Sequence, residues 1–179
     1  ETSSHSLDQG RLDGIAFAAA VFTNVTRDHL DYHGTMDAYL AAKLRLASLL
    51  AQDGTAVVNA DEPAWATLPA GVRRLTFGRN GAADLRGIEL EIAIYFSTLE
   101  ALQNVAKYAD AGSAEVALPL LGDFNVDNAL GAAGAALALG ESLAAVADRL
   151  TRSPQVPGRM ERLVAAPAVV LRDYAHTPD

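Results

Sequence analysis

The stretch Ile15-Ala-Phe-Ala-Ala-Ala-Val-Phe22 is a continuous apolar run with the length of a β-strand. Such a run is typical of a strand that is buried on both faces, although a buried helical segment has the same pattern. We predict a central strand that reaches about Val25. Thr55-Ala-Val-Val-Asn59 has the same character, and a helical pattern separates the two runs. This order predicts a strand–helix–strand unit.

The intervening helix is expected to begin after Thr35 as its cap and to end near Asp53-Gly54. Helical spacing places Lys43 on its apolar side, in one stripe with Met36, Tyr39, Leu40, Leu46, Ala47 and Leu50. Lysine is rarely buried. In one interpretation the alkyl stem packs and the ammonium group reaches solvent. In the other, Lys43 has a function, because two histidines and three aspartates lie just upstream.

The remaining patterns extend the same architecture along the chain. We expect a short helix capped by Ser3 or Ser4 and stopped by Gly10. Further predicted elements are a helical segment around Trp65, a strand over 73–77, a long helix after Leu121, a helix over 141–152 and two strands around Pro167. Residues 88–96 have strand character, and 97–110 have helical spacing. The predicted fold class is α/β, with a central, mostly parallel sheet flanked by helices.

Composition excludes several classes of protein. The chain has 179 residues, half of them hydrophobic, which suffices for a buried core. A net charge of −8 and the lack of a Lys/Arg cluster argue against nucleic acid as a partner. No apolar run has the length of a membrane span, so we expect no membrane partner. The lack of cysteine excludes disulfides and thiolate chemistry and fits a cytoplasmic protein. Oligomeric state is not readable from the sequence.

Five motifs stand out along the chain. They are Glu1-Thr-Ser-Ser-His-Ser-Leu-Asp-Gln-Gly-Arg11, Asn24-Val-Thr-Arg-Asp-His-Leu-Asp-Tyr-His-Gly34 with Ala41-Ala-Lys43, Gly122-Asp-Phe-Asn-Val-Asp-Asn128, Pro157-Gly-Arg-Met-Glu161 and Asp173-Tyr-Ala-His-Thr-Pro-Asp179. In this order they resemble the Mur ligase family, and most closely its MurE type. The resemblance implies an ATP-dependent amide ligase that adds the third amino acid, a diamino acid, to UDP-MurNAc-L-Ala-D-Glu through an acyl phosphate. It also implies Mg²⁺ as a cofactor.

The resemblance covers only part of such an enzyme. Residues 1–171 match a central domain without its phosphate loop, and 172–179 match the start of a linker to a C-terminal domain. The glycine-rich loop with Lys-Ser/Thr occurs nowhere in the 179 residues, and family order places it before Glu1. We therefore expect the chain to be a piece of a longer protein and to lack ligase activity by itself.

The metal site is the first set of residues that the resemblance implies. The family's lysine at the place of Lys43 carries a carbamate, and burial would favour the neutral amine that forms it by lowering the lysine pKa. A carbamate supplies oxygen ligands, which suit Mg²⁺. His29 matches the histidine that shares this ion, and Glu1 matches the glutamate that holds a second one. A loop histidine and a terminal glutamate without function are the plainer interpretations.

The resemblance also implies residues for the two larger substrates. Ser3, Gln9 and Arg11 fall where the family binds the UDP-linked peptide. Asn125, Asn128, Arg159 and Asp173 fall where it binds ATP, with Arg159 also catalytic. Each has a plainer interpretation: a helix cap for Ser3, Asn125 and Asn128, a solvated position for Gln9, Arg11 and Arg159, and a strand-end turn for Asp173. His5 and His33 have no predicted role, and His176 is placed in a hinge.

Two alternatives remain open. A folylpolyglutamate synthetase-like ligase would share the ATP site and the modified lysine, but the motif over 1–11 argues against it. A non-catalytic binding or scaffold module derived from the ligase domain is the other. A phosphate loop upstream of Glu1 would favour a ligase over a module.

Overall fold

The computed structural model describes residues 1–79, 83–86, 116, 118–164 and 170–174. The chain divides into two compact units, and each is described by itself. The first comprises Glu1–Glu89 and Leu130–Gly140, and the second comprises Leu90–Ala129 and Glu141–Asp179. The predictions for 88–96, 97–110 and His176 lie outside the described residues.

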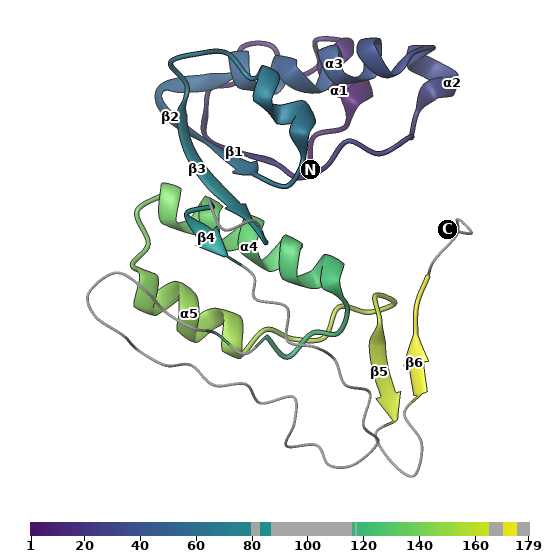
Figure 1. Ribbon diagram of the computed structural model, residues 1–179, viewed down its shortest axis with the longest axis vertical. Coiled ribbons are helices and arrows are strands. Elements are labelled where there is room, and N and C mark those ends of the chain that lie inside the picture. Colours follow the sequence, from purple (N-terminus) through teal and green to yellow (C-terminus); the bar gives the residue numbers. More distant parts are fainter. Residues whose placement is uncertain (80–82, 87–115, 117, 165–169, 175–179) are drawn as a thin grey trace. The chain divides into compact units, whose positions relative to one another are not determined.

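A four-stranded parallel sheet forms the centre of the first unit (Figure 1). Its strands β1 (Phe17–Phe22), β2 (Leu50–Asn59), β3 (Arg73–Gly78) and β4 (Leu85–Arg86) lie side by side in sequence order. Val57 in the middle of β2 pairs with Val21 of β1 and Leu75 of β3. The predicted α/β class with a mostly parallel sheet is confirmed. β1 is shorter than expected, and Ile15 before it is exposed.

One face of this sheet is covered by elements close to it in sequence. They are α1 (Ser4–Asp8), α3 (Met36–Ser48) and the 3₁₀ helix η1 (Pro63–Thr67). The core that they share with the sheet contains Leu7, Ala20, Phe22, Leu46, Ala47, Ala56, Val58, Trp65 and Leu68. Ser3 caps α1, and Thr35 caps α3 through a hydrogen bond from the Ala38 amide. Both predicted caps are therefore confirmed.

The other face is covered by the C-terminal part of α4 (Asp123–Ala138), from Leu130 onward. Two glycines let this helix approach the strands. A Cβ atom on Gly131 would lie 3.2 Å from Val21 Cγ1, and one on Gly134 would overlap Val57 Cγ1. The long apolar strands are thus covered on both faces, as their lack of alternation predicts.

The predicted end of the α3 helix near Asp53-Gly54 is wrong. α3 ends at Ser48, and β2 begins two residues later, because the Phe17 amide donates to the Leu49 carbonyl and pairs the start of β1 with Leu50. The register then shifts, so that Ala19 pairs with Thr55. Gly54 permits this irregularity, since a Cβ there would lie 2.7 Å from the Phe17 carbonyl oxygen. Local helical spacing carries no signal for such a long-range pairing.

In the second unit, α5 (Leu143–Thr151) is capped by Ser142 and matches the predicted helix over 141–152. The expected strands around Pro167 are β5 (Glu161–Val164) and β6 (Val170–Arg172), which pair antiparallel. Among the helices that the structure describes, none has the length and apolar character to cross a membrane.

Candidate functional site

Lys43 lies on the buried side of α3, as the stripe predicts, but only half-buried. Tyr39 and Leu46 on the same side are buried. The Lys43 Nζ donates to the Asn24 carbonyl at 3.4 Å and lies 5.1 Å from the centre of the Tyr39 ring. The amine is therefore held at the loop that follows β1 rather than extended into solvent.

His29 occupies the N-cap position of the short helix α2 (Leu30–His33), without a capping hydrogen bond from its side chain, inside what the sequence predicts as a loop. Its φ of 55° is left-handed, a conformation that costs free energy in a residue with a side chain. The carboxylate of Asp28 compensates, since it accepts the His29 amide at 2.8 Å and lies 3.6 Å from Nε2. A strained backbone at a predicted ligand is consistent with a functional position.

His29 belongs to a group of aromatic side chains that we call the ring cluster: His5, His29, Tyr32, His33 and Tyr39. The His5 ring lies 4.9 Å from His29 and 4.2 Å from Tyr32, measured between ring centres. Tyr39 lies 6.2 Å from His29 and 5.4 Å from His33. Because Tyr39 also carries the Lys43 amine over its face, the ring cluster brings His29 and Lys43 to one side chain.

The predicted sugar-peptide residues lie beside this cluster. Gln9 donates to the Tyr32 hydroxyl at 3.1 Å, and the buried Ser4 hydroxyl is 3.0 Å from His33 Nε2. The Ser3 hydroxyl caps α1, and Arg11 is exposed beyond its end. The motifs over 1–11 and 24–34 therefore form one surface, which the sequence does not indicate.

The loop after β1 is fixed by η1, which follows β2. Glu62 accepts the Val25 amide through one carboxylate oxygen and the Ala64 amide through the other, both at 3.1 Å. The Trp65 indole donates to the Thr23 carbonyl at 3.4 Å. These bonds hold the residues on both sides of Asn24, whose carbonyl receives Lys43. The carboxyl ends of parallel strands are where ligands bind in such sheets.

The described residues include no group of three His, Asp or Glu side chains close enough to hold a metal ion. Glu1 is exposed at the start of the chain and does not complete such a group with His29. An unmodified ammonium group is no metal ligand. The donor set thus fits Mg²⁺ only if Lys43 carries an oxygen-bearing group, as the predicted carbamate would.

In the second unit, Arg159 lies in a tight turn over 157–160, which we call the arginine turn. Gly158 and Met160 on its two sides have φ values of 70° and 46°, both left-handed. The Tyr174 amide donates to the Gly158 carbonyl at 2.9 Å, and a Cβ on Gly158 would overlap the Tyr174 ring. The structure therefore brings the motif containing Arg159 to the end of β6, where Asp173 follows. Both side chains are exposed.

Glu161 completes this arrangement. Its Oε2 accepts the Gly158 amide at 2.8 Å and the Arg172 guanidinium at 2.9 Å from Nε and 2.5 Å from Nη2. The Gly158 amide, followed by Arg172, holds the pKa of Glu161 below its ordinary value. In turn, the Glu161 carboxylate raises the pKa of Arg172, first through its hydrogen bond to the guanidinium.

The two asparagines predicted for adenine lie inside α4 and not at its cap, because the helix begins at Asp123. The cap interpretation is therefore wrong for both. Asn125 is buried, and its Nδ2 donates to the Leu121 carbonyl at 2.6 Å just before the helix. Asn128 is exposed.

Sequence reasoning missed the supporting residues. Tyr39 is recognisable only as a member of the apolar stripe, one helical turn before Lys43. Glu161 and Tyr174 stand inside the motifs of Arg159 and Asp173, but the sequence does not indicate which groups they contact. Glu62 has no such signal, because its partner Val25 lies far along the chain.

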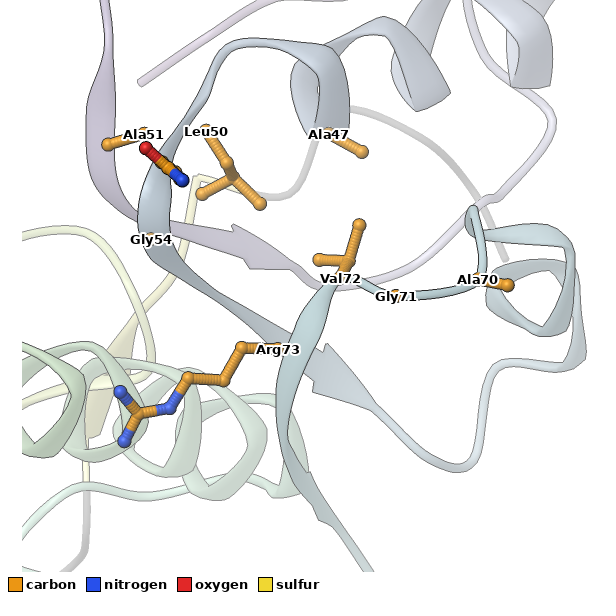
Figure 2. Close-up of a pocket in the computed structure, with 9 residues that line it drawn as sticks. Ala47, Leu50, Ala51, Gly54, Ala70, Gly71, Val72 and Arg73 are labelled. Atoms are coloured by element: carbon orange, nitrogen blue, oxygen red, sulfur yellow. The ribbon is translucent and has the colours of Figure 1, made fainter.

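A shallow hollow of about 320 Å³ lies at the amino ends of the strands, whereas Lys43 lies near the carboxyl end of β1 (Figure 2). Its walls come from the end of α3 and from the amino ends of β2 and β3. They include Ala47, Leu50, Gly54, Val72 and Arg73. None of the predicted site residues lines it.

The fold and the contacts between motifs agree with comparisons to known proteins. Residues 1–136 match the family model described as the Mur ligase middle domain, so the chain belongs to this family. It is 44% identical over 185 residues to UDP-N-acetylmuramoyl-L-alanyl-D-glutamate–2,6-diaminopimelate ligase of Synechococcus elongatus, and 46% identical over 193 residues to the ligase of the same name from Parasynechococcus marenigrum. The whole chain is covered in both, and it spans about a third of these relatives, 36% and 37%.

Solved structures give the same result. A UDP-N-acetylmuramoyl-L-alanyl-D-glutamate–2,6-diaminopimelate ligase matches with a TM-score of 0.71 and 34% identity, over 99% of this chain and 36% of that one. MurF from Acinetobacter baumannii matches with a TM-score of 0.68 and 26% identity, over 87% of this chain and 33% of that one.

Proposed function

We propose that this chain is the central part of an ATP-dependent ligase. The enzyme would join 2,6-diaminopimelate to UDP-N-acetylmuramoyl-L-alanyl-D-glutamate, in peptidoglycan synthesis. The observation that carries the proposal is identity of 41–46% over the whole chain to eight relatives that all bear this ligase's name. An enzyme that consumes ATP works where ATP is supplied, so the proposal includes a cytoplasmic location.

The geometry of the first unit supports a ligand role for His29 and Lys43. Lys43 would act as a carbamate, formed when its neutral amine bonds to carbon dioxide and releases a proton. With His29 it would hold Mg²⁺, and Glu1 would hold a second ion. Bound Mg²⁺ neutralises negative charge on the phosphate and carboxylate groups that react. Tyr39 and Asn24 hold the Lys43 amine at the loop that follows β1, which contains His29.

The other predicted residues would position the two substrates. Ser3, Gln9 and Arg11 would bind the UDP-linked peptide, with Arg11 suited to grip a carboxylate by two hydrogen bonds. Asn125, Asn128 and Asp173 would bind the nucleoside part of ATP. Arg159 would stabilise charge on the phosphate that is transferred to the substrate carboxylate, giving an acyl phosphate that the diamino acid then attacks.

The test is a ligation assay on the complete protein that contains this chain. We expect ATP-dependent product with 2,6-diaminopimelate, detected by mass spectrometry, and far less with L-lysine. No product with either would overturn the proposal, and product from a folate and glutamate would favour the alternative ligase. Residues 1–179 alone are expected to give no product, because the phosphate loop is absent from them.

Lys43 offers a sharper test, since Lys107 is the only other lysine of the chain. We expect Lys43→Ala to lower the ligation rate by roughly 100-fold or more, the scale of removing one stabilising group at the reacting centre. Lys107→Ala is the matched control and should change it little. Native mass spectrometry with bicarbonate and Mg²⁺ should show the mass of one added carbon dioxide, lost in Lys43→Ala.

A further inference from the structure

One carboxylate in the second unit touches the immediate neighbours of two predicted nucleotide-binding residues. Glu161 Oε2 accepts the amide of Gly158, which precedes Arg159, at 2.8 Å. The same oxygen accepts the guanidinium of Arg172, which precedes Asp173, at 2.9 and 2.5 Å. Glu161 and Arg172 are eleven positions apart in the sequence. The carboxylate therefore joins the arginine turn to the end of β6.

We propose that Glu161 is a positioning residue that fixes the spacing between Arg159 and Asp173, so that both reach one bound nucleotide. The inference rests on the proposed function, because it takes ATP as the ligand of these two residues. Glu161 itself faces inward, with 18% of its side chain exposed, whereas Arg159 and Asp173 are exposed. This division suits a residue that acts through its neighbours.

The backbone of the arginine turn explains why a support is needed. Arg159 lies between two left-handed residues, Gly158 and Met160. A left-handed residue with a side chain is held only where its surroundings determine it. Met160 is that residue here, and the Gly158 backbone on the other side of Arg159 is held by two bonds: its amide donates to Glu161, and its carbonyl accepts from Tyr174. Without Glu161 the turn keeps the bond from Tyr174 and the bond from the Arg159 amide to the Val156 carbonyl at 3.1 Å, but its Gly158 amide loses its acceptor. We therefore expect the direction of the Arg159 side chain to vary more.

The chemistry of the pair also suits a support. Two guanidinium donors of Arg172, Nε and Nη2, reach the same Glu161 oxygen, and such charge-assisted hydrogen bonds are stronger than neutral ones. The Gly158 amide and Arg172 lower the pKa of Glu161, so the carboxylate is charged at neutral pH. Glu161 thus stays an acceptor for both partners under the conditions of ATP binding.

Calorimetry on the complete protein tests the proposal, with Mg·ADP and the UDP-linked precursor as separate probes. We expect Glu161→Ala to weaken Mg·ADP binding by roughly tenfold, the effect of losing hydrogen bonds to a charged group. Affinity for the UDP-linked precursor should stay within about twofold, since Ser3, Gln9 and Arg11 lie in the other unit. A purely structural defect would weaken both.

Two further variants keep the result interpretable if Glu161→Ala folds poorly. Glu161→Gln retains an acceptor for the Gly158 amide but not the charge. Its affinity for Mg·ADP should therefore lie between that of the unaltered protein and that of Glu161→Ala. The exchange Glu161→Arg/Arg172→Glu restores opposite charges but offers Gly158 no acceptor, so it should not restore Mg·ADP affinity. Glu141→Ala, which breaks the exposed pair with Arg149 on α5, is the matched control and should bind like the unaltered protein.

The outcomes separate the two claims. If the unaltered protein does not bind Mg·ADP, the proposed function fails, and this inference fails with it. If it binds Mg·ADP and Glu161→Ala binds equally well, only the inference is overturned. Full restoration by the charge exchange would also overturn it, because the contact to Gly158 would then be irrelevant.

Discussion

The ring cluster and the arginine turn present predicted site residues by different means. Around Lys43 the contacts are between side chains: the Tyr39 ring lies against the amine and the imidazoles. Around Arg159 the contacts run mostly through the backbone of Gly158, which Glu161 and Tyr174 hold at its amide and carbonyl. The first region should therefore be sensitive to loss of side chains, and the second to any change in backbone geometry.

The largest expected loss of stability is in the region around Lys43, where contacts between side chains dominate. Trp65 is 3% exposed, packs against Phe22 at 5.2 Å between ring centres, and donates to the Thr23 carbonyl. Trp65→Ala should lower the free energy of unfolding by about 3–5 kcal/mol, measured by urea titration. Trp65→Phe keeps most of the buried ring and should lose about 1 kcal/mol with the indole bond. Equal losses in both variants would contradict a packing role.

The next effect lies in the backbone of the arginine turn. Gly158→Ala places a Cβ on a left-handed residue and against the Tyr174 ring, and should destabilise by roughly 2 kcal/mol. Gly140→Ala is the matched control, since Gly140 has φ 92° with open space around it and should show strain alone. Adding Tyr174→Ala to Gly158→Ala should recover part of the loss. No recovery would mean that the ring contact is unimportant.

A smaller effect is expected where a carboxylate holds the loop beside Lys43. Glu62→Ala removes the acceptor of the Val25 and Ala64 amides and should cost about 1 kcal/mol, since the site is partly exposed. Glu62→Gln keeps an acceptor and should cost less. Hydrogen exchange of the Val25 amide, followed by NMR, should accelerate in Glu62→Ala. Unchanged protection there would show that Trp65 alone fixes the loop.

The smallest effect is a dependence on pH in the arginine turn. The pKa of Glu161 is lowered in the folded chain, first by the Gly158 amide and then by Arg172. Its contribution to stability is therefore present above the ordinary glutamate pKa of about 4.3 and is lost as the pH falls below it. Solvent screening keeps the contribution small. Glu161→Gln should abolish this part of the acid dependence, read from the Gly158 amide shift by NMR.

Asp84 provides the counterpart of this titration in the first unit. The Thr76 amide and hydroxyl donate to it at 2.8 and 2.7 Å and hold its pKa below the ordinary value. The contribution of Asp84 to stability should likewise disappear as the pH falls below its ordinary pKa. The loss would affect strands β3 and β4 rather than the arginine turn. Acid dependence that survives Glu161→Gln and disappears in Asp84→Asn would therefore belong to the sheet.

Much of the fold was predictable because its signals are local. Ser3, Thr35 and Ser142 stand next to the helices that they cap, and β1 and the second half of β2 are short apolar runs. The end of α3 was not predictable, since the pairing of Phe17 with Leu50 joins residues far apart in the chain. The position of Asn125 within α4 was missed for a similar reason, because its bond to the Leu121 carbonyl depends on where the helix starts.

The amino-acid sequence by itself determined the order of elements and the α/β class, because spacing and residue type encode these along the chain. The site residues were predicted from motifs that resemble those of the Mur ligase family. Only the tertiary structure decided which of those residues have common neighbours. It brought His29 and Lys43 to Tyr39, and the Arg159 turn to the strand that ends before Asp173 through Glu161. Such contacts depend on packing and on hydrogen bonds between distant residues, which no local pattern records.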